Sequence, residues 1–280
     1  MKTKDFREYK AYALVTGAAS GMGRLYAIEL AKRGYSLVLV DINAENLEKT
    51  KAESMDAVNG LEGSHESFRK DFRVMTVVQD LTQQDAAQKV AGAAEGLEVE
   101  VLVNNAGIMY FQEIAATSRK ALSLIMMLHM YTPLMLCREF VPQMKERGKG
   151  YILNISSLAA WMAWPGIGMY GNTKRFVKGF SRQLRIECRG TGVSVTNAYF
   201  GAVDTPLVPL SPKYRKIARA IRVMIPAEKA VGKALKATFR HRKGTMPGLI
   251  NKIAMPIVAA LPDCILAWLL KMLRPILMNV

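Results

Sequence analysis

The chain has 280 residues, of which 50% are hydrophobic and 22% are charged, and its net charge is +16. This is a globular composition, with enough residues for one large α/β domain or two small ones. The three cysteines are far apart and no Cys/His metal spacing occurs, so we expect reduced thiols and no metal site. The mixed charges at the N-terminus argue against a secretory leader, so we expect a cytoplasmic protein.

The positive charge is concentrated in the last quarter of the chain. From Lys213 onward there are fourteen Lys and Arg residues but only two acidic ones, Glu228 and Asp263. Such a cluster could bind phosphate-bearing substrates or an anionic membrane surface. It could equally be a solvated basic face that has no partner. No nucleic-acid module accompanies the charge, so we do not expect nucleic acid as a partner.

The N-terminal part of the chain predicts a βαβ unit. A short apolar run over 11–16 stops at a glycine, as a buried strand does. Residues 22–33 have helical spacing, with a basic last turn followed by Gly34, and 36–40 form the next apolar run. Two strands joined through a helix are expected to be parallel, with a right-handed crossover.

The alternation of strands and helices continues along the chain. Further strands are predicted over 74–79, 100–104, 151–156 and 193–199, and helices over 170–189 and over 121–147, where Pro142 should disturb the later part. Strands that are continuously apolar indicate an open, mostly parallel sheet with helices on both faces, which is a doubly wound, Rossmann-type α/β fold. Ligands of such sheets bind beyond the carboxyl ends of the strands.

Two segments depart from this alternation. Residues 201–226 contain four prolines, and we expect a substrate loop or lid within a domain that spans 1–250. Residues 251–280 form an apolar tail, but prolines and charges interrupt it too often for a spanning helix. The tail could rest on a membrane interface, cover the substrate entrance or pack on another subunit.

A glycine-rich loop follows the first predicted strand. Its sequence, TGAASGMG, has the spacing G-x-x-x-G-x-G and leads into the first helix. Glycines let the backbone approach a pyrophosphate, and the N–H groups of the following helix then face the anion. We therefore expect a dinucleotide to bind at Gly17, Ser20, Gly21, Met22 and Gly23.

Asp41 ends the second predicted strand. A carboxylate at this place can accept both hydroxyls of the adenosine ribose and would repel a 2′-phosphate. This favours NAD(H) over NADP(H) as cofactor. The alternative is that Asp41 only caps the turn at Asn43 and Ala44.

Ser157, Tyr170 and Lys174 form the strongest candidate catalytic group. Tyr170 and Lys174 are four residues apart and share one face at the start of a helix. A free tyrosine has a pKa of about 10, which a nearby ammonium lowers. Ser157 follows a predicted strand, where its hydroxyl could hold a substrate oxygen beside the phenol.

Together these motifs resemble the short-chain dehydrogenase/reductase family over residues 11–250. The glycine loop, Ser157 and the Y-x-x-x-K pair match its cofactor loop and catalytic residues. The resemblance also implies cofactor contacts from Tyr170 and Lys174 themselves and from Asp80, Leu81, Asn105, Ala106, Gly107, Val203 and Thr205.

Two positions depart from the family pattern. Phe200 stands where the family usually has a proline, which should change only the local backbone. His129 stands at the place of the family's catalytic asparagine, which supports a water-mediated proton relay. A histidine there could relay protons itself, or it could simply pack in the helix without a catalytic role.

The resemblance implies a homodimer or homotetramer that interconverts a secondary alcohol and a ketone by hydride transfer. Within the family, the chain resembles hydroxysteroid dehydrogenases and long-chain 3-oxoacyl reductases, so a hydrophobic substrate is expected. An apolar pocket for it would be lined by Trp161, Met162, Trp164, Pro165 and Met169. The alternative is a dinucleotide-binding regulatory protein of the same fold that has lost catalysis.

Overall fold

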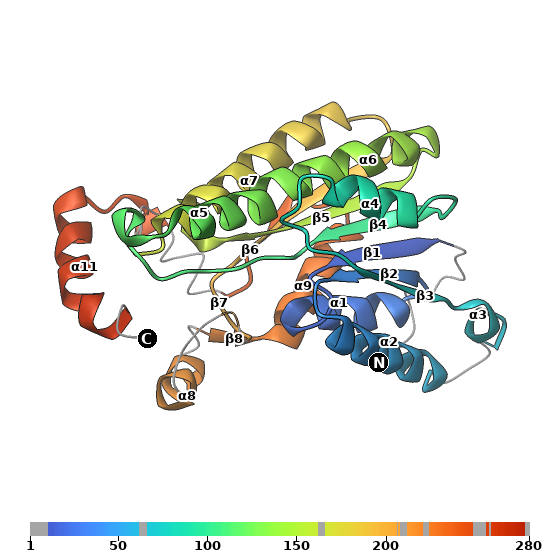
Figure 1. Ribbon diagram of the computed structural model, residues 1–280, viewed down its shortest axis with the longest axis horizontal. Coiled ribbons are helices and arrows are strands. Elements are labelled where there is room, and N and C mark those ends of the chain that lie inside the picture. Colours follow the sequence, from blue (N-terminus) through green and yellow to red (C-terminus); the bar gives the residue numbers. More distant parts are fainter. Residues whose placement is uncertain are drawn as a thin grey trace.

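A computed structural model describes residues 11–61, 66–161, 166–205, 207, 212–220, 224–248, 256–257 and 259–277. Its centre is a seven-stranded sheet in the order β3-β2-β1-β4-β5-β6-β9, in which every neighbouring pair is parallel (Figure 1). The strands are β1 (Tyr12–Thr16), β2 (Ser36–Asp41), β3 (Val74–Val78), β4 (Val99–Asn104), β5 (Gly150–Ser157), β6 (Val193–Phe200) and β9 (Gly244–Thr245). All the strands predicted from apolar runs are confirmed, with ends that differ by at most one residue.

Helices cover both faces of this sheet (Figure 1). Leu14 belongs to the core on one face, whereas Ala13 and Val15 belong to the core on the other face. Both sides of each central strand are therefore buried, which explains the continuous apolar runs. The core that contains Ala13 and Val15 is shared by α1 (Gly21–Ala31), α2 (Ala44–Asn59) and α9 (Ala227–Thr238). The core that contains Leu14 is shared by α4 (Ala86–Ala93), α6 (Thr132–Glu146) and α7 (Gly168–Glu187).

The helix predicted over 121–147 is interrupted earlier than expected. It consists of α5 (Arg119–Met126), a π-helical turn η2 (Met127–Tyr131) and α6, and α6 continues through Pro142. The expected disturbance at Pro142 is therefore wrong. Pro133 has no N–H with which to bond the carbonyl of His129, so the ladder loosens there into the wider turn.

The combined helix Arg119–Glu146 is long and apolar enough to cross a membrane by length and composition alone. In this fold, however, α6 packs against α4, β4 and β5 and buries Phe140 and Met144 in the core. Core helices of globular proteins meet the same length and composition criteria, so these criteria do not identify this helix as membrane-spanning.

The segment 201–226 has its own secondary structure. A short strand, β7 (Ala202–Asp204), pairs with β8 (Met224–Pro226), and the helix α8 (Pro212–Ala220) lies between them in the chain. Asp204 on β7 forms ion pairs with Arg215, at 2.5 Å, and with Arg219, both on α8. One carboxylate therefore fastens α8 to the small sheet.

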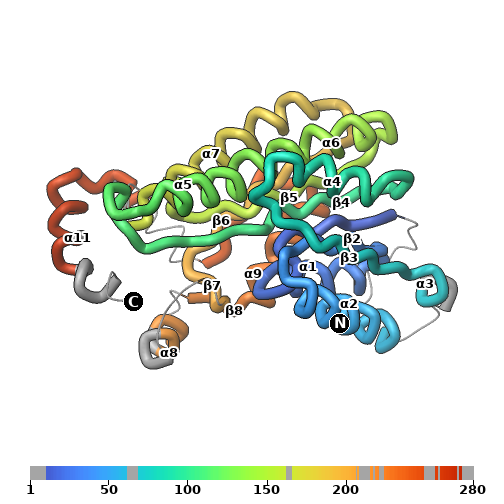
Figure 2. Tube along the Cα trace, viewed as in Figure 1, coloured from blue at the N-terminus to red at the C-terminus, as the bar shows by residue number. Residues whose placement is uncertain are grey.

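Within the apolar tail, the helix α11 (Asp263–Leu277) lies beside the body of the molecule (Figures 1 and 2). Leu266 is buried, whereas Ile265, Trp268 and Met272 are exposed at a spacing that places them on one face. α3 (Glu66–Asp71), at the other end of the molecule, precedes β3.

Candidate active site

The glycine loop turns sharply between β1 and α1. Gly17 adopts a φ of 65°, which a residue with a side chain rarely takes. A β-carbon on Gly23 would collide with the carbonyl of Gly17, so the first turn of α1 packs directly on the loop. This close approach leaves the first N–H groups of α1 available to an anion at the helix N-terminus.

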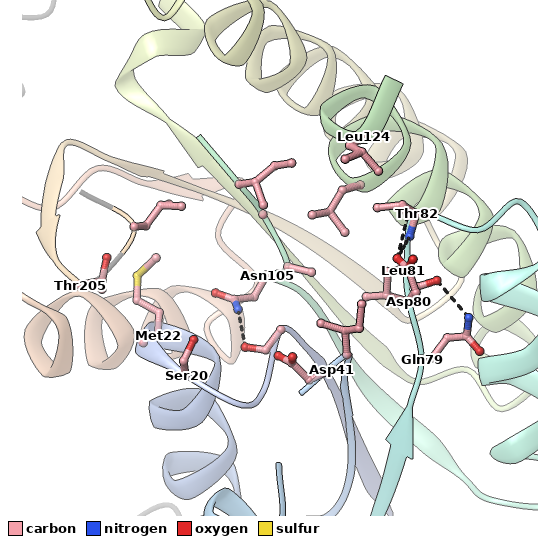
Figure 3. A pocket seen from close by; sticks show the side chains of 18 of the residues that line it. Ser20, Met22, Asp41, Gln79, Asp80, Leu81, Thr82, Asn105, Leu124 and Thr205 are labelled. Carbon is pink, nitrogen blue, oxygen red and sulfur yellow. Dashed lines mark hydrogen bonds between the residues drawn. The ribbon is translucent and has the colours of Figure 1, made fainter. Parts of the chain in front are cut away.

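A cavity of about 700 Å³ opens beside this loop at the carboxyl ends of β1, β2 and β4 (Figure 3). Eleven of the fifteen residues expected to bind a cofactor line it. Tyr170 and Lys174 do not line it, Gly23 is packed beneath the loop, and Val203 is buried in β7. The eleven are Gly17, Ser20, Gly21, Met22, Asp41, Asp80, Leu81, Asn105, Ala106, Gly107 and Thr205. A cavity of this volume with a helix N-terminus in its wall fits a dinucleotide.

Asp41 is held in place at the wall of this cavity. One carboxylate oxygen accepts a hydrogen bond from the N–H of Ala19 and the other accepts one from the N–H of Asn43, each at 3.0 Å. Asp41 thus supports the turn before α2, which Asn43 caps, and also lines the cavity. The two sequence interpretations of Asp41 are compatible.

The segment from Asn104 to Gly107 ties the cavity to the centre of the sheet. The side chain of Asn105 donates to the carbonyl of Thr16 at 2.9 Å, and the Thr16 hydroxyl accepts from the N–H groups of Asn105 and Ala106. Asn104 donates to the side chain of Asn154 on β5 at 2.8 Å. These bonds fix the cavity wall relative to the strand that carries Ser157.

Ser157, Tyr170 and Lys174 meet as the sequence predicts. Ser157 is the last residue of β5, Tyr170 lies in the first turn of α7, and Lys174 follows one turn later. The Lys174 ammonium lies 5.6 Å from the centre of the Tyr170 ring and donates a hydrogen bond to the carbonyl of Ile155 at 3.0 Å. An alcohol, a phenol and a buried cation therefore share one small space.

The acidities in this group differ from the expectation. Burial raises the pKa of Tyr170, and a hydrogen bond with Ser157 opposes the rise. Burial lowers the pKa of Lys174 to about 8. Loss of hydration outweighs the expected effect of the ammonium on the phenol, so Tyr170 carries its proton at neutral pH.

His129 lies buried between the cavity wall and α7. Its Nε2 accepts a hydrogen bond from the N–H of Ile108 at 3.0 Å, so Nδ1 carries the proton and donates to the hydroxyl of Thr173 at 2.9 Å. That hydroxyl in turn donates to the carbonyl of Tyr170 at 2.8 Å. Burial and the charge of Lys174 lower the pKa of His129 well below its usual value, so the ring is neutral.

The comparisons with known proteins agree with this arrangement. The family model for short chain dehydrogenases matches residues 11–214, which is most of the chain. The chain belongs to the short-chain dehydrogenase family.

Curated relatives within this family act on long acyl chains or steroids, according to their names. The chain is 34% identical over 189 residues to the very-long-chain 3-oxoacyl-CoA reductase-A of Danio rerio, an alignment that covers 66% of this chain and 55% of that protein. It is 32% identical to the 17-beta-hydroxysteroid dehydrogenase type 3 of Mus musculus, covering 72% of this chain and 63% of that protein. The chain thus spans less than two thirds of the length of these relatives.

Solved structures of short-chain dehydrogenases share the fold at lower identity. A structure from work on 7beta-hydroxysteroid dehydrogenase superposes with a TM-score of 0.76 at 23% identity, covering 90% of this chain and 93% of that one. A short-chain dehydrogenase from Sphingobium yanoikuyae in complex with NADPH gives a TM-score of 0.73, also at 23% identity, with coverages of 90% and 96%.

The two departures from the short-chain dehydrogenase pattern have different settings. Phe200 is buried at the end of β6, where it pairs with Ser157 on β5, so it packs beside the site. His129 contacts two elements of the site at once. A β-carbon on Gly107 would lie 2.9 Å from its Nε2, so the glycine makes room for the imidazole.

Sequence reasoning missed part of the cavity wall. Ile42 directly follows Asp41 and Thr82 directly follows Leu81, so both could have been predicted from the sequence. Lys120, Leu124 and Leu128 come from α5 and η2, and no sequence signal places these elements over the cavity. The full set of unpredicted lining residues is Ile42, Gln79, Thr82, Ile108, Tyr110, Lys120, Leu124, Leu128 and Leu207.

Trp161 is the last residue of the short helix η3 (Leu158–Trp161) that follows Ser157. The ammonium of Lys178 lies 3.1 Å from the centre of its ring, and Tyr199 meets the ring edge-on at 5.6 Å. The other predicted pocket residue within the described part of the chain, Met169, is partly exposed in α7. Met162, Trp164 and Pro165 lie outside the described residues.

Proposed function

We propose that this protein is an NAD(H)-dependent oxidoreductase that interconverts a secondary alcohol and a ketone on a hydrophobic substrate. The observation that carries the proposal is the meeting of Ser157, Tyr170 and Lys174 beside a cavity built around a glycine loop. When bound, the nicotinamide cofactor supplies or accepts the hydride. The protein residues must hold the substrate oxygen and move one proton.

Tyr170 is the proton donor in the reductive direction. Its raised pKa keeps the phenol protonated at neutral pH, so the hydroxyl can donate to a carbonyl oxygen as negative charge develops there. Ser157 donates a hydrogen bond to the same oxygen, and the charge of Lys174 stabilises the phenolate that remains. In the oxidative direction the phenolate takes the proton back.

The direct test replaces Tyr170 by Phe, which keeps the ring and removes the proton. We expect a loss of about 100-fold or more in turnover, with cofactor affinity unchanged in a fluorescence titration. Tyr12→Phe, at the start of β1, is the matched control and should keep full activity. A Tyr170→Phe enzyme with a large fraction of wild-type turnover would refute the assignment.

The preference for NAD(H) rests on Asp41. Its carboxylate lines the cavity at the end of β2, and the described residues that line this cavity include one cation, Lys120 on α5, but no arginine. A 2′-phosphate beside Asp41 would face a negative charge without a compensating guanidinium. The measurement is the ratio of kcat/KM values for NADH and NADPH.

For the substrate, we propose a steroid or a fatty-acyl compound. The relatives named above are a 3-oxoacyl-CoA reductase and a hydroxysteroid dehydrogenase. Trp161, four residues after Ser157, contacts Tyr199, which pairs with Ser156 across the sheet, so the two rings supply apolar surface near Ser157. A panel of hydrophobic ketones, long-chain 3-oxoacyl thioesters and small sugars tests this, and turnover of the sugars alone would contradict it.

We propose that His129 positions the site rather than relays protons. A relay needs a ring nitrogen that exchanges protons with solvent, whereas both nitrogens of His129 are engaged with protein groups and the ring is buried. The rival function, a regulatory protein without catalysis, predicts tight NADH binding without turnover of any ketone in the panel.

We further propose that the protein is cytoplasmic and that α11 lets it contact a membrane surface. Its exposed face carries Ile265, Trp268 and Met272, with Lys271 beside them, a pattern typical of interfacial helices. Anionic liposomes should co-sediment the wild-type protein but not an Ile265→Ser/Trp268→Ser variant. Assembly into a homodimer or homotetramer is expected for the family, and light scattering measures it.

A further inference from the structure

One face of α9 carries a row of positive charges. Lys229, Lys233 and Lys236 are spaced by four and three residues on α9, so their side chains leave the helix on one side, and Arg240 follows in the turn after the helix ends at Thr238. The last three, together with Arg242 and the segment from Thr245 to Gly248, line a hollow of about 460 Å³. We call this hollow the cationic groove.

The chain after α9 holds the second wall of the groove in a fixed position. It reverses at His241, whose φ of 53° is left-handed, and the N–H of Arg242 bonds to the carbonyl of Ala237 at 3.0 Å. The Thr196 hydroxyl donates to the carbonyl of Arg242 at 2.7 Å, and β9 then pairs with β6. Arg242 and Thr245 therefore face α9 from a well-anchored segment.

The described residues do not neutralise the charges of the groove. Within the described part of the chain, Lys233, Lys236, Arg240 and Arg242 form no ion pair, and the one acid on α9, Glu228, lies in its first turn. On two other helices a cation is paired within the helix, as Lys49 is with Glu45 on α2 and Lys89 with Asp85 at the start of α4. Four cations that share one hollow repel one another unless an anion binds between them.

The cationic groove is separate from the cofactor cavity. The two share no lining residue. α9 begins near the cavity, after β8, but Phe239 at its end packs against Tyr35 and Tyr151, which lie where β2 and β5 begin. The twelve-residue helix spans about 18 Å, so a ligand of the groove lies well away from the catalytic group.

We propose that the cationic groove binds a soluble small molecule that carries two or more linked phosphate groups. Ammonium and guanidinium groups are the side chains that bind phosphate most strongly, and several of them around one hollow match a chain of phosphates better than a single one. The concave shape favours a small ligand over a partner with a flat surface, such as a membrane.

The test is calorimetric titration of the full chain with inorganic tripolyphosphate at saturating NADH, which keeps the glycine loop occupied. We expect Lys236→Gln/Arg240→Gln to weaken binding by about tenfold or more, with NADH turnover unchanged. The matched control, Arg182→Gln/Arg189→Gln, removes two exposed cations of α7 and its end, outside the groove, and should change the affinity by less than about twofold.

Three outcomes would overturn the proposal. The first is no binding of tripolyphosphate by the wild-type protein. The second is equal weakening in both double variants, because that result indicates only a general attraction by net charge. The third is that vesicles with anionic lipid bind through Lys236 and Arg240 while tripolyphosphate does not, which would make the groove a membrane contact.

Discussion

The backbone N–H of Ile108 donates a hydrogen bond to Nε2 of His129 over 3.0 Å. This bond joins the wall of the cofactor cavity to a helix that also contacts Thr173, three residues after Tyr170. The imidazole is therefore a link between the cofactor cavity and the catalytic helix. Its two bonds require a neutral ring with the proton on Nδ1.

Loss of this link should slow the enzyme without changing its pH profile. In His129→Phe the Ile108 N–H has no ring acceptor, so we expect the protein to lose about 1–3 kcal/mol of stability and also turnover. His129→Gln can again accept from Ile108 and should recover part of both. If His129 instead relays protons, the kcat profile near neutral pH will change in shape in both variants.

The same histidine should make the fold sensitive to acid. Its pKa is lowered in the folded state, so below about pH 6.5 the unfolded chain binds a proton that the folded chain does not. The free energy of unfolding should thus fall as the pH decreases below 6.5, by up to about 1.4 kcal/mol per pH unit. Urea unfolding at pH 7 and pH 5 measures this, and His129→Gln should show a smaller difference between the two pH values.

Reduction should slow as the pH rises through about 8. In that range Lys174 loses its proton, since burial lowers its pKa to about 8, and the phenolate of Tyr170 loses the cation that stabilises it. Lys174→Arg keeps a charge at all accessible pH values. The fall in kcat/KM near pH 8 should therefore move to higher pH or vanish in this variant, even if its maximal rate is lower. An unchanged fall in Lys174→Arg would assign it to another group.

Removal of the charge of Asp41 should relax the choice of cofactor. In Asp41→Asn one side-chain oxygen remains to accept from Ala19 or Asn43, but the repulsion of a 2′-phosphate is gone. We expect the NADH to NADPH ratio of kcat/KM to fall by about tenfold or more. Asp85→Asn, which removes an exposed carboxylate on the surface, serves as the control and should leave the ratio unchanged.

The ion pairs of Asp204 should keep α8 attached to the small sheet of β7 and β8. Asp204→Asn removes the charge that joins Arg215 and Arg219, and the two guanidinium groups then repel each other. We expect faster proteolysis within α8 and a higher KM for the cofactor, because Thr205 next to Asp204 lines the cofactor cavity. Equal proteolysis rates in wild type and variant would show that the ion pairs do not restrain α8.

Much of the molecule followed from local patterns. Buried strands of a doubly wound sheet are apolar on both faces, so the runs at β1, β2, β4, β5 and β6 could be recognised without a partner strand. The glycine loop, Asp41 and the spacing of Tyr170 and Lys174 are also local, since each depends on one turn or one helix face.

Tertiary structure decided the rest. From the sequence, His129 could be either a proton relay or a packed residue. Only the positions of Ile108 and Thr173, which are distant in the chain, determine which ring nitrogen carries the proton and that the ring is neutral. Likewise, the expected lowering of the pKa of Tyr170 considered charge alone, whereas packing removes water from the ring and raises that pKa. Local sequence fixes which groups are present, but hydration and long-range contacts set their acidity, and these exist only once the chain has packed.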